Sequence, residues 1–166
     1  MSSDRPDDRR GRPWRGLVAG ALGGILGTFA MGQFHALFQN PATSSSQETE
    51  DSTVKAASAI SQAIFDHKLT PEEKKIAGPV MDYAFGTSMA AVYGAVAELL
   101  PHARAGYGMA FGATVWLGAH VITVPALGLS EPITRSTPAS EGIEFGAHLV
   151  YGVVAEGIRR LIRTAI

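Results

Sequence analysis

Hydrophobic residues gather into long stretches of the chain, and polar segments separate these stretches. No Asp, Glu, Lys or Arg occurs in three of them, residues 16–38, 83–97 and 105–130. A fourth stretch, residues 141–162, is apolar apart from charges near its two ends. A helix needs about 20 mostly apolar residues to cross a bilayer core of ~30 Å. The pattern therefore predicts an all-α, four-span transmembrane bundle with spans at about residues 15–38, 79–100, 106–126 and 141–162.

The connection between the first two spans, residues 39–78, is polar but has helical periodicity of its own. Val54, Ala57, Ile60 and Ile64 recur at the spacing of one helix face. This spacing predicts an amphipathic helix in the first outer loop, lying on the membrane surface or over the bundle.

A second helix start follows in the stretch LTPEEKK. Thr70 is placed to be the N-cap, Pro71 stands at the first helical position, and Glu73 is placed to close a capping box. We expect Gly78–Pro79 to break or bend the chain before the second span. Residues 1–14 predict a disordered cytoplasmic tail, and residues 15–166 a single membrane domain.

Composition narrows the function classes. Charged residues make up 17% of the chain, against about 25% in soluble domains, and the net charge is -1, so no basic surface for nucleic acid is expected. The absence of Cys excludes disulfides and thiolate metal sites. No catalytic or nucleotide-binding motif occurs, which predicts a non-enzymatic protein without a cofactor. The alternative is a soluble Gly/Ala-rich bundle, but its helices would carry charged faces.

The distribution of arginine predicts the orientation in the membrane. Four spans place both termini on one side, and the basic residues of that side include Arg5, Arg9, Arg10, Arg12, Arg15, Arg104, Arg159, Arg160 and Arg163. Basic residues are enriched in cytoplasmic segments. Both termini are therefore predicted to be cytoplasmic.

Glycines of the first span stand four residues apart. Gly16, Gly20 and Gly24 form one row, and Gly27 lies beside it. Small residues at this spacing allow two helix backbones to approach closely in lipid. The row predicts a helix-packing face, whose partner is a helix of this chain, a second copy of it or another membrane protein. An accessory subunit that binds a partner through this face is the alternative function.

The predicted topology brings ionisable residues of all four spans into the outer half of the bilayer: His35, Asp82, His120, Glu144 and His148. Histidine changes its charge between neutral and mildly acidic pH, so this outer set is a candidate proton-responsive cluster. One alternative is structural hydrogen bonding between helices. A metal site of His120, Glu144 and His148, or a haem held by the two histidines, is a weaker alternative.

A simpler set occupies the inner ends of the spans. Glu98 and Glu156 lie within reach of Arg104, Arg159 and Arg160 in the predicted topology. Carboxylates and arginines at an interface form ion pairs that fix the depth of a helix. We interpret this inner set as a structural anchor.

Two segments of the C-terminal half carry a family resemblance. AHVITVPALGLSEP and EFGAHLVYGVVAEGIRR resemble the YagU-like family of predicted bacterial inner-membrane proteins of unknown function, and HKLTPEEKKIAGPVMDYAFG is similar to its short members. The matching positions are His120, Pro125, Gly128, Leu129, Pro132, Glu144, His148, Glu156, Arg159 and Arg160. The resemblance covers about Thr53–Arg163. It implies an integral inner-membrane protein linked to acid resistance, with no established reaction.

Overall fold

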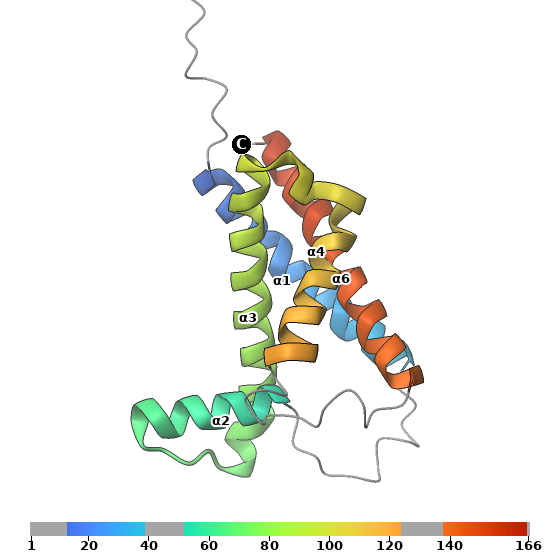
Figure 1. Ribbon diagram of the computed structural model, residues 1–166. Coiled ribbons are helices and arrows are strands. Elements are labelled where there is room, and N and C mark those ends of the chain that lie inside the picture. Colours follow the sequence, from blue (N-terminus) through green and yellow to red (C-terminus); the bar gives the residue numbers. More distant parts are fainter. Residues whose placement is uncertain (1–12, 39–51, 124–137, 166) are drawn as a thin grey trace, which may run out of the picture.

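A computed structural model describes residues 13–38, 52–123 and 138–165 of the chain. Every element in these ranges is a helix (Figure 1). In chain order they are α1 (Pro13–Phe38), α2 (Ser52–Phe65), α3 (Pro71–Leu99), the 3-10 helix η2 (Pro101–Gly108), α4 (Met109–Val115), the π-helix η3 (Trp116–Thr123) and α6 (Pro138–Ala165).

The long helices α1, α3 and α6 form the framework of the molecule (Figure 1). α1 packs against both α3 and α6, while α4 covers α6 and α2 packs against α3. The start of α1 and the last residues of α3 and α6 lie at one end, here called the terminal end. α2 lies at the opposite end, here called the α2 end. α1 therefore runs in the opposite direction to α3 and α6.

The expectation of four spans is supported for one helix by length and composition. Within residues 13–38, 52–123 and 138–165, α1 alone is both long and apolar enough to cross a membrane. α3 and α6 are longer than α1 but carry more polar residues. The end of the third predicted span, residues 124–126, lies outside the described residues, as do residues 1–12 of the predicted tail.

The predicted capping box at the start of α3 is confirmed. The Glu73 amide donates to Thr70 Oγ1 at 3.3 Å, and the Thr70 amide donates to Glu73 Oε2 at 2.7 Å. The hydrogen bond from the Thr70 amide, together with His67, lowers the pKa of the Glu73 carboxyl. α2 is also present as predicted, over Ser52–Phe65.

Of the break or bend predicted at Gly78–Pro79, the break is wrong, because α3 is one continuous helix from Pro71 to Leu99. Pro79 has no amide hydrogen to donate, which weakens a helix interior, yet the helix continues on both sides of it. Gly78 has a packing role instead. An ideal Cβ at this position would lie 2.9 Å from Val54 Cγ2, so the glycine lets α2 approach α3 closely.

The sequence predicts the third span as one regular helix from residue 106, but the structure has a turn there, followed by an α-helix and a π-helix. The backbone is left-handed at Gly106, Tyr107 and Gly108, with φ of 63°, 53° and 89°, and α-helix begins only at Met109. A Cβ at Gly108 would collide with the Gly152 carbonyl of α6. The turn is therefore set by how closely the chain approaches α6. From Trp116 the helix widens to π-helical geometry.

The core of the bundle combines small residues in close contact with the buried side chains of Tyr93, Val115 and Tyr151. Gly16, Gly20 and Gly24 of α1 face the backbone of α3, while Gly23 and Gly27 face α6. The fully buried hydrophobic residues include Ala19, Ala90, Ala97, Ala147 and Ala155. The glycine face of α1 is thus covered within the chain, and a partner would have to displace α3 to reach it.

Large apolar side chains lie on the outside of the bundle. On α1 the exposed ones include Leu17, Leu22, Ile25, Leu26 and Phe29, and on α3 they include Val80, Phe85, Val92 and Leu99. Water-soluble proteins bury such residues most often, whereas helices in lipid meet through small residues. In this bundle, small residues form the contacts between helices and many large apolar side chains are exposed.

The close α1–α3 contact gives a matched test on one helix. A Cβ at Gly20 would collide with the Ala90 carbonyl of α3, whereas a Cβ at Gly32 would meet nothing within 4 Å. Gly20→Ala should therefore lower the melting temperature of the purified protein by several degrees, since overpacking costs about 1–3 kcal/mol. Gly32→Ala should leave it unchanged or raise it. Equal melting temperatures for the two variants, measured in detergent, would contradict this packing.

Candidate functional site

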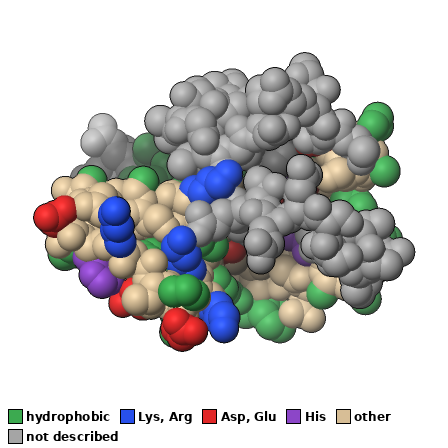
Figure 2. Space-filling view, turned by 90° about the horizontal axis from the view of Figure 1, so that it is seen from below, with side chains coloured by type: hydrophobic (Ala, Val, Ile, Leu, Met, Phe, Trp, Pro, Cys, Tyr) green, Lys and Arg blue, Asp and Glu red, His purple; other side chains and the backbone are tan. Residues whose placement is uncertain are grey.

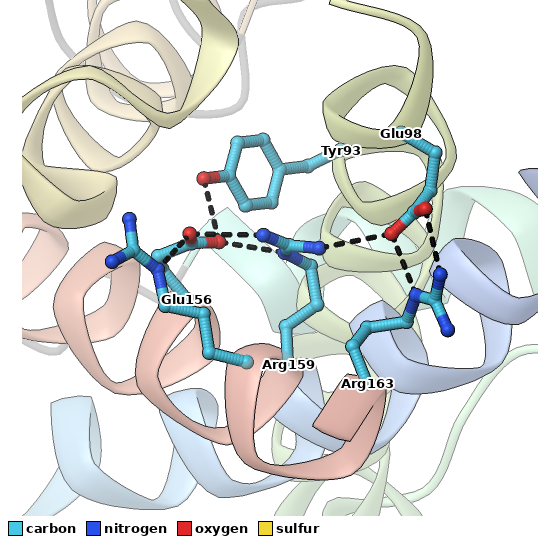
Figure 3. A network of polar contacts seen from close by, with 6 residues as sticks. Tyr93, Glu98, Glu156, Arg159 and Arg163 are labelled. Carbon is cyan, nitrogen blue, oxygen red and sulfur yellow. Dashed lines mark hydrogen bonds and ion pairs between the residues drawn. The ribbon is translucent and has the colours of Figure 1, made fainter. Parts of the chain in front are cut away.

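A network of buried charges joins α3 to α6 at the terminal end (Figure 3). We call it the terminal network, and its members are Tyr93, Glu98, Glu156, Arg159, Arg160 and Arg163. On α6 the four members recur at intervals of three and four residues, which places them along one helix face. Tyr93 and Glu98 come from the facing side of α3. The network is therefore a contact between two helices rather than a chain of neighbours on one helix.

Glu156 lies at the centre of the network and is 0% exposed. Arg159 donates to its carboxylate through Nε at 2.6 Å and Nη2 at 3.0 Å, a bidentate pair. Arg160 Nε donates at 2.6 Å and the Tyr93 hydroxyl at 2.9 Å. These four bonds replace the hydration that the buried carboxylate has lost.

Glu98 forms the second half of the network. Arg163 donates to its two oxygens at 2.7 and 2.9 Å, and Arg159 Nη1 donates to Oε1 at 3.2 Å. Arg159, which is 2% exposed, thus bridges both carboxylates. Hydrogen bonding to Glu98 raises the pKa of Arg163.

The electrostatics explain how so many charges are accommodated. Removing an ion from water costs several kcal/mol, and only good geometry with further hydrogen bonds offsets this cost. Here each carboxylate receives bidentate arginine bonds, the geometry in which such pairs are strongest. The arginines that extend the network outward, Arg160 and Arg163, keep side-chain exposures of 44% and 23%. The network can hold helices together and anchor their ends, and it contains no exposed nucleophile.

The predicted inner set is brought together only in part. The structure joins Glu98, Glu156, Arg159 and Arg160, but Arg104 forms no ion pair with any described residue and acts on Glu98 from a distance. Sequence reasoning missed Arg163 and Tyr93. The spacing of Arg163, seven residues after Glu156, was a usable signal. The role of Tyr93 had no signal beyond the need of a buried hydroxyl for a partner.

The α2 end holds the residues of the predicted outer set. His35 Nε2 of α1 lies 3.2 Å from Glu144 Oε2 of α6, with side-chain exposures of 22% and 26%. His148 Nδ1 donates to the Glu144 backbone carbonyl at 2.8 Å, one helical turn away. Asp82 is half-buried on α3. The side chain of His120 lies outside the described part of the chain.

The alternative of a metal site at His120, Glu144 and His148 stays a prediction. Among the described residues, no group of three or more His, Asp or Glu side chains is arranged to hold a metal ion. The proposed triad needs His120 as its third ligand, whose side chain is not among them. His148 commits the proton of Nδ1 to the Glu144 backbone carbonyl.

A known family covers most of the chain. The family described as a protein of unknown function (DUF1440) matches residues 27–157 of the 166-residue chain. The chain belongs to the DUF1440 family. No curated protein and no solved structure matches the chain. The DUF1440 match includes His35, Glu144, Glu98 and Glu156, and it ends before Arg159.

Two substitutions in the terminal network of this DUF1440 protein should lower the free energy of unfolding by very different amounts, because one removes a buried charge and the other an exposed one. Glu156→Gln leaves the buried Arg159 with only Glu98, so it should lower the free energy of unfolding by about 3–5 kcal/mol. Arg160→Gln removes an arginine that is 44% exposed, and such pairs contribute about 1 kcal/mol or less. Denaturation in detergent measures both. A Glu156→Gln loss no larger than that of Arg160→Gln would show that the buried carboxylate is dispensable.

Proposed function

We propose that the protein is an integral membrane protein in which α1, α3, the α4–η3 segment and α6 all cross the bilayer. The supporting observation is the reversed distribution of residue sizes. Val92 of α3 is 61% exposed, while Ala90 and Ala97 of the same helix are 0% exposed. Lipid covers a surface of large apolar side chains without the free-energy cost that water imposes.

The most deeply buried charged residues of α3 and α6 are compatible with this placement because they point inward. Glu156 and Arg159 are buried against α3, and intramembrane charges are tolerated when they face the bundle and pair with one another. The residue beyond them on α6, Leu161, is 67% exposed. The average hydropathy of α6 therefore understates how apolar its outward face is.

The charges at the two ends favour a cytoplasmic location for the terminal end. Arg15, Arg104, Arg159, Arg160 and Arg163 lie there, and the acidic residues Glu98 and Glu156 are engaged by three of them. The α2 end carries side chains of both signs (Figure 2), among them Lys55, Asp66, Lys68, Glu72 and Glu73. Excess Arg and Lys mark the cytoplasmic side, and this supports a cytoplasmic location for both termini in a bacterial cell.

The absence of Cys makes this topology directly testable with single cysteines. Lys75→Cys at the α2 end should react with a membrane-impermeant thiol reagent in intact cells. Ala165→Cys at the terminal end should react only after the cells are permeabilised. Both positions are exposed, so burial does not protect either one. Labelling of both in intact cells, or the reverse pattern, would exclude the proposed orientation.

Within this topology we propose a proton-responsive role in acid stress for the His35–Glu144 contact. The two side chains connect α1 to α6 at the α2 end, which faces outward in the proposed orientation. As the external pH falls, His35 takes up a proton. An attraction between opposite charges then strengthens the α1–α6 contact, until further acidification neutralises Glu144. No catalytic step is part of this role.

A cell lacking the protein and complemented with variants tests this role. His35→Gln and Glu144→Gln should each reduce survival in acid, because neither can form the charged pair. His67→Gln is the matched control, since His67 pairs with Glu73 at 3.1 Å in a more exposed setting, with side-chain exposures of 50% and 46%. Full acid survival of both test variants at normal protein levels would rule out the role.

A further inference from the structure

A basic cavity opens beside the terminal network. Its volume is about 560 Å³, and His102, Arg104, Ala105 and Arg160 line it. Arg104 forms no ion pair among the described residues, and Arg160 uses only Nε to bind Glu156. The remaining guanidinium donors of both arginines are available to a ligand. The cavity is suited to an anion with several acceptor oxygens, such as a phosphate group.

An apolar groove adjoins the cavity. It has a volume of about 450 Å³, and apart from Arg160 and Thr164 its lining is apolar, with Tyr107, Val153, Val154, Ile158 and Leu161. Arg160 lines both spaces. Its guanidinium carbon lies 4.3 Å from the centre of the Tyr107 ring, a cation–π contact that holds the arginine at the junction. One ligand can therefore reach from the cavity into the groove.

Positive charge is in excess at this end. Among the described residues of this region, four arginines stand against two carboxylates: Arg104, Arg159, Arg160 and Arg163 against Glu98 and Glu156. Both carboxylates already accept hydrogen bonds from arginines. An added anion is therefore attracted rather than repelled. A free phosphate would use only the cavity, whereas the groove offers apolar contact along α6 in the direction of the bilayer core.

We propose that the cavity and groove together bind one anionic phospholipid. Arg104, Arg160 and His102 hold the phosphate, and an acyl chain lies along Val153, Val154 and Ile158. The proposal rests on the membrane placement proposed above, because it puts this end at the cytoplasmic interface. Basic pockets between helices on that side are suited to anionic lipid headgroups. The lipid would fix the turn at Tyr107 against α6.

Thermal unfolding of the purified full-length protein in detergent tests the proposal. Phosphatidylglycerol should raise the melting temperature by several degrees, and phosphatidylcholine, which carries no net charge, should not. Inorganic phosphate at the same concentration should give little effect, because it lacks the acyl chain. Equal effects of the two lipids would overturn the proposal, and an equal effect of inorganic phosphate would show a free-anion site instead.

Amino-acid substitutions test the binding of the lipid headgroup and of the acyl chain separately. Arg104→Gln should weaken phosphatidylglycerol binding about fivefold, while Lys75→Gln, which removes the same charge at the α2 end, should leave it unchanged. Gly157→Leu should block the groove, since the nearest atom to a Cβ there is 3.8 Å away and space exists to fill. Leu161→Gln, at a position 67% exposed, makes the groove polar without disturbing packing. Unchanged lipid binding in Arg104→Gln, or in both groove variants, would overturn the proposal.

Separating the membrane and aqueous fractions of cells tests the membrane placement independently of the lipid site. Recovery of the protein in the aqueous fraction of cells would remove the proposed membrane placement and the lipid site with it. A protein that stays in the membrane but does not distinguish phosphatidylglycerol from phosphatidylcholine would lose only the lipid site.

Discussion

Close contact between helix backbones is the constraint on which the rest of the structure depends. At Gly16 and Gly20, α1 approaches Ala90 and Gly94 of α3 so closely that no Cβ fits between them, and Gly23 meets Ala155 of α6 in the same way. Such contacts gain dispersion energy from many atom pairs and bury almost no large side chain. Gly and Ala therefore fill much of the interior, alongside the buried rings of Tyr93 and Tyr151, and many large aliphatic residues lie on the outside.

That constraint also explains the position of the charges. Where Gly and Ala bring the helix backbones together, little space is left for ions. The terminal network occupies one end, with Arg159 bridging Glu156 and Glu98, and the His35–Glu144 contact lies at the other. Between them the buried Tyr151 hydroxyl of α6 donates to the Gly86 carbonyl of α3 at 2.6 Å. The arrangement separates the tightly hydrogen-bonded terminal network from the His35–Glu144 contact at the α2 end.

Features that depend on residues close together in the sequence could be predicted, whereas contacts between distant segments could not. The glycine row and the capping box depend on residues a few positions apart, so spacing alone reveals them. Gly78 of α3 contacts Val54 of α2, and the left-handed turn that ends at Gly108 packs against Gly152 of α6. The pairing of Glu144 with His35 depends on how α1 and α6 cross. Such contacts between distant segments leave no periodic signal.

The central claim is that lipid covers the outward faces of helices whose average hydropathy is modest. A spin label at Val92→Cys, on the outward face of α3, tests it most directly, because the chain has no other Cys and Val92 is 61% exposed. In liposomes the account predicts that oxygen, which concentrates in lipid, relaxes the label strongly and that a water-soluble nickel chelate does not. Strong relaxation by the nickel chelate with little effect of oxygen would place this face in water and contradict the account.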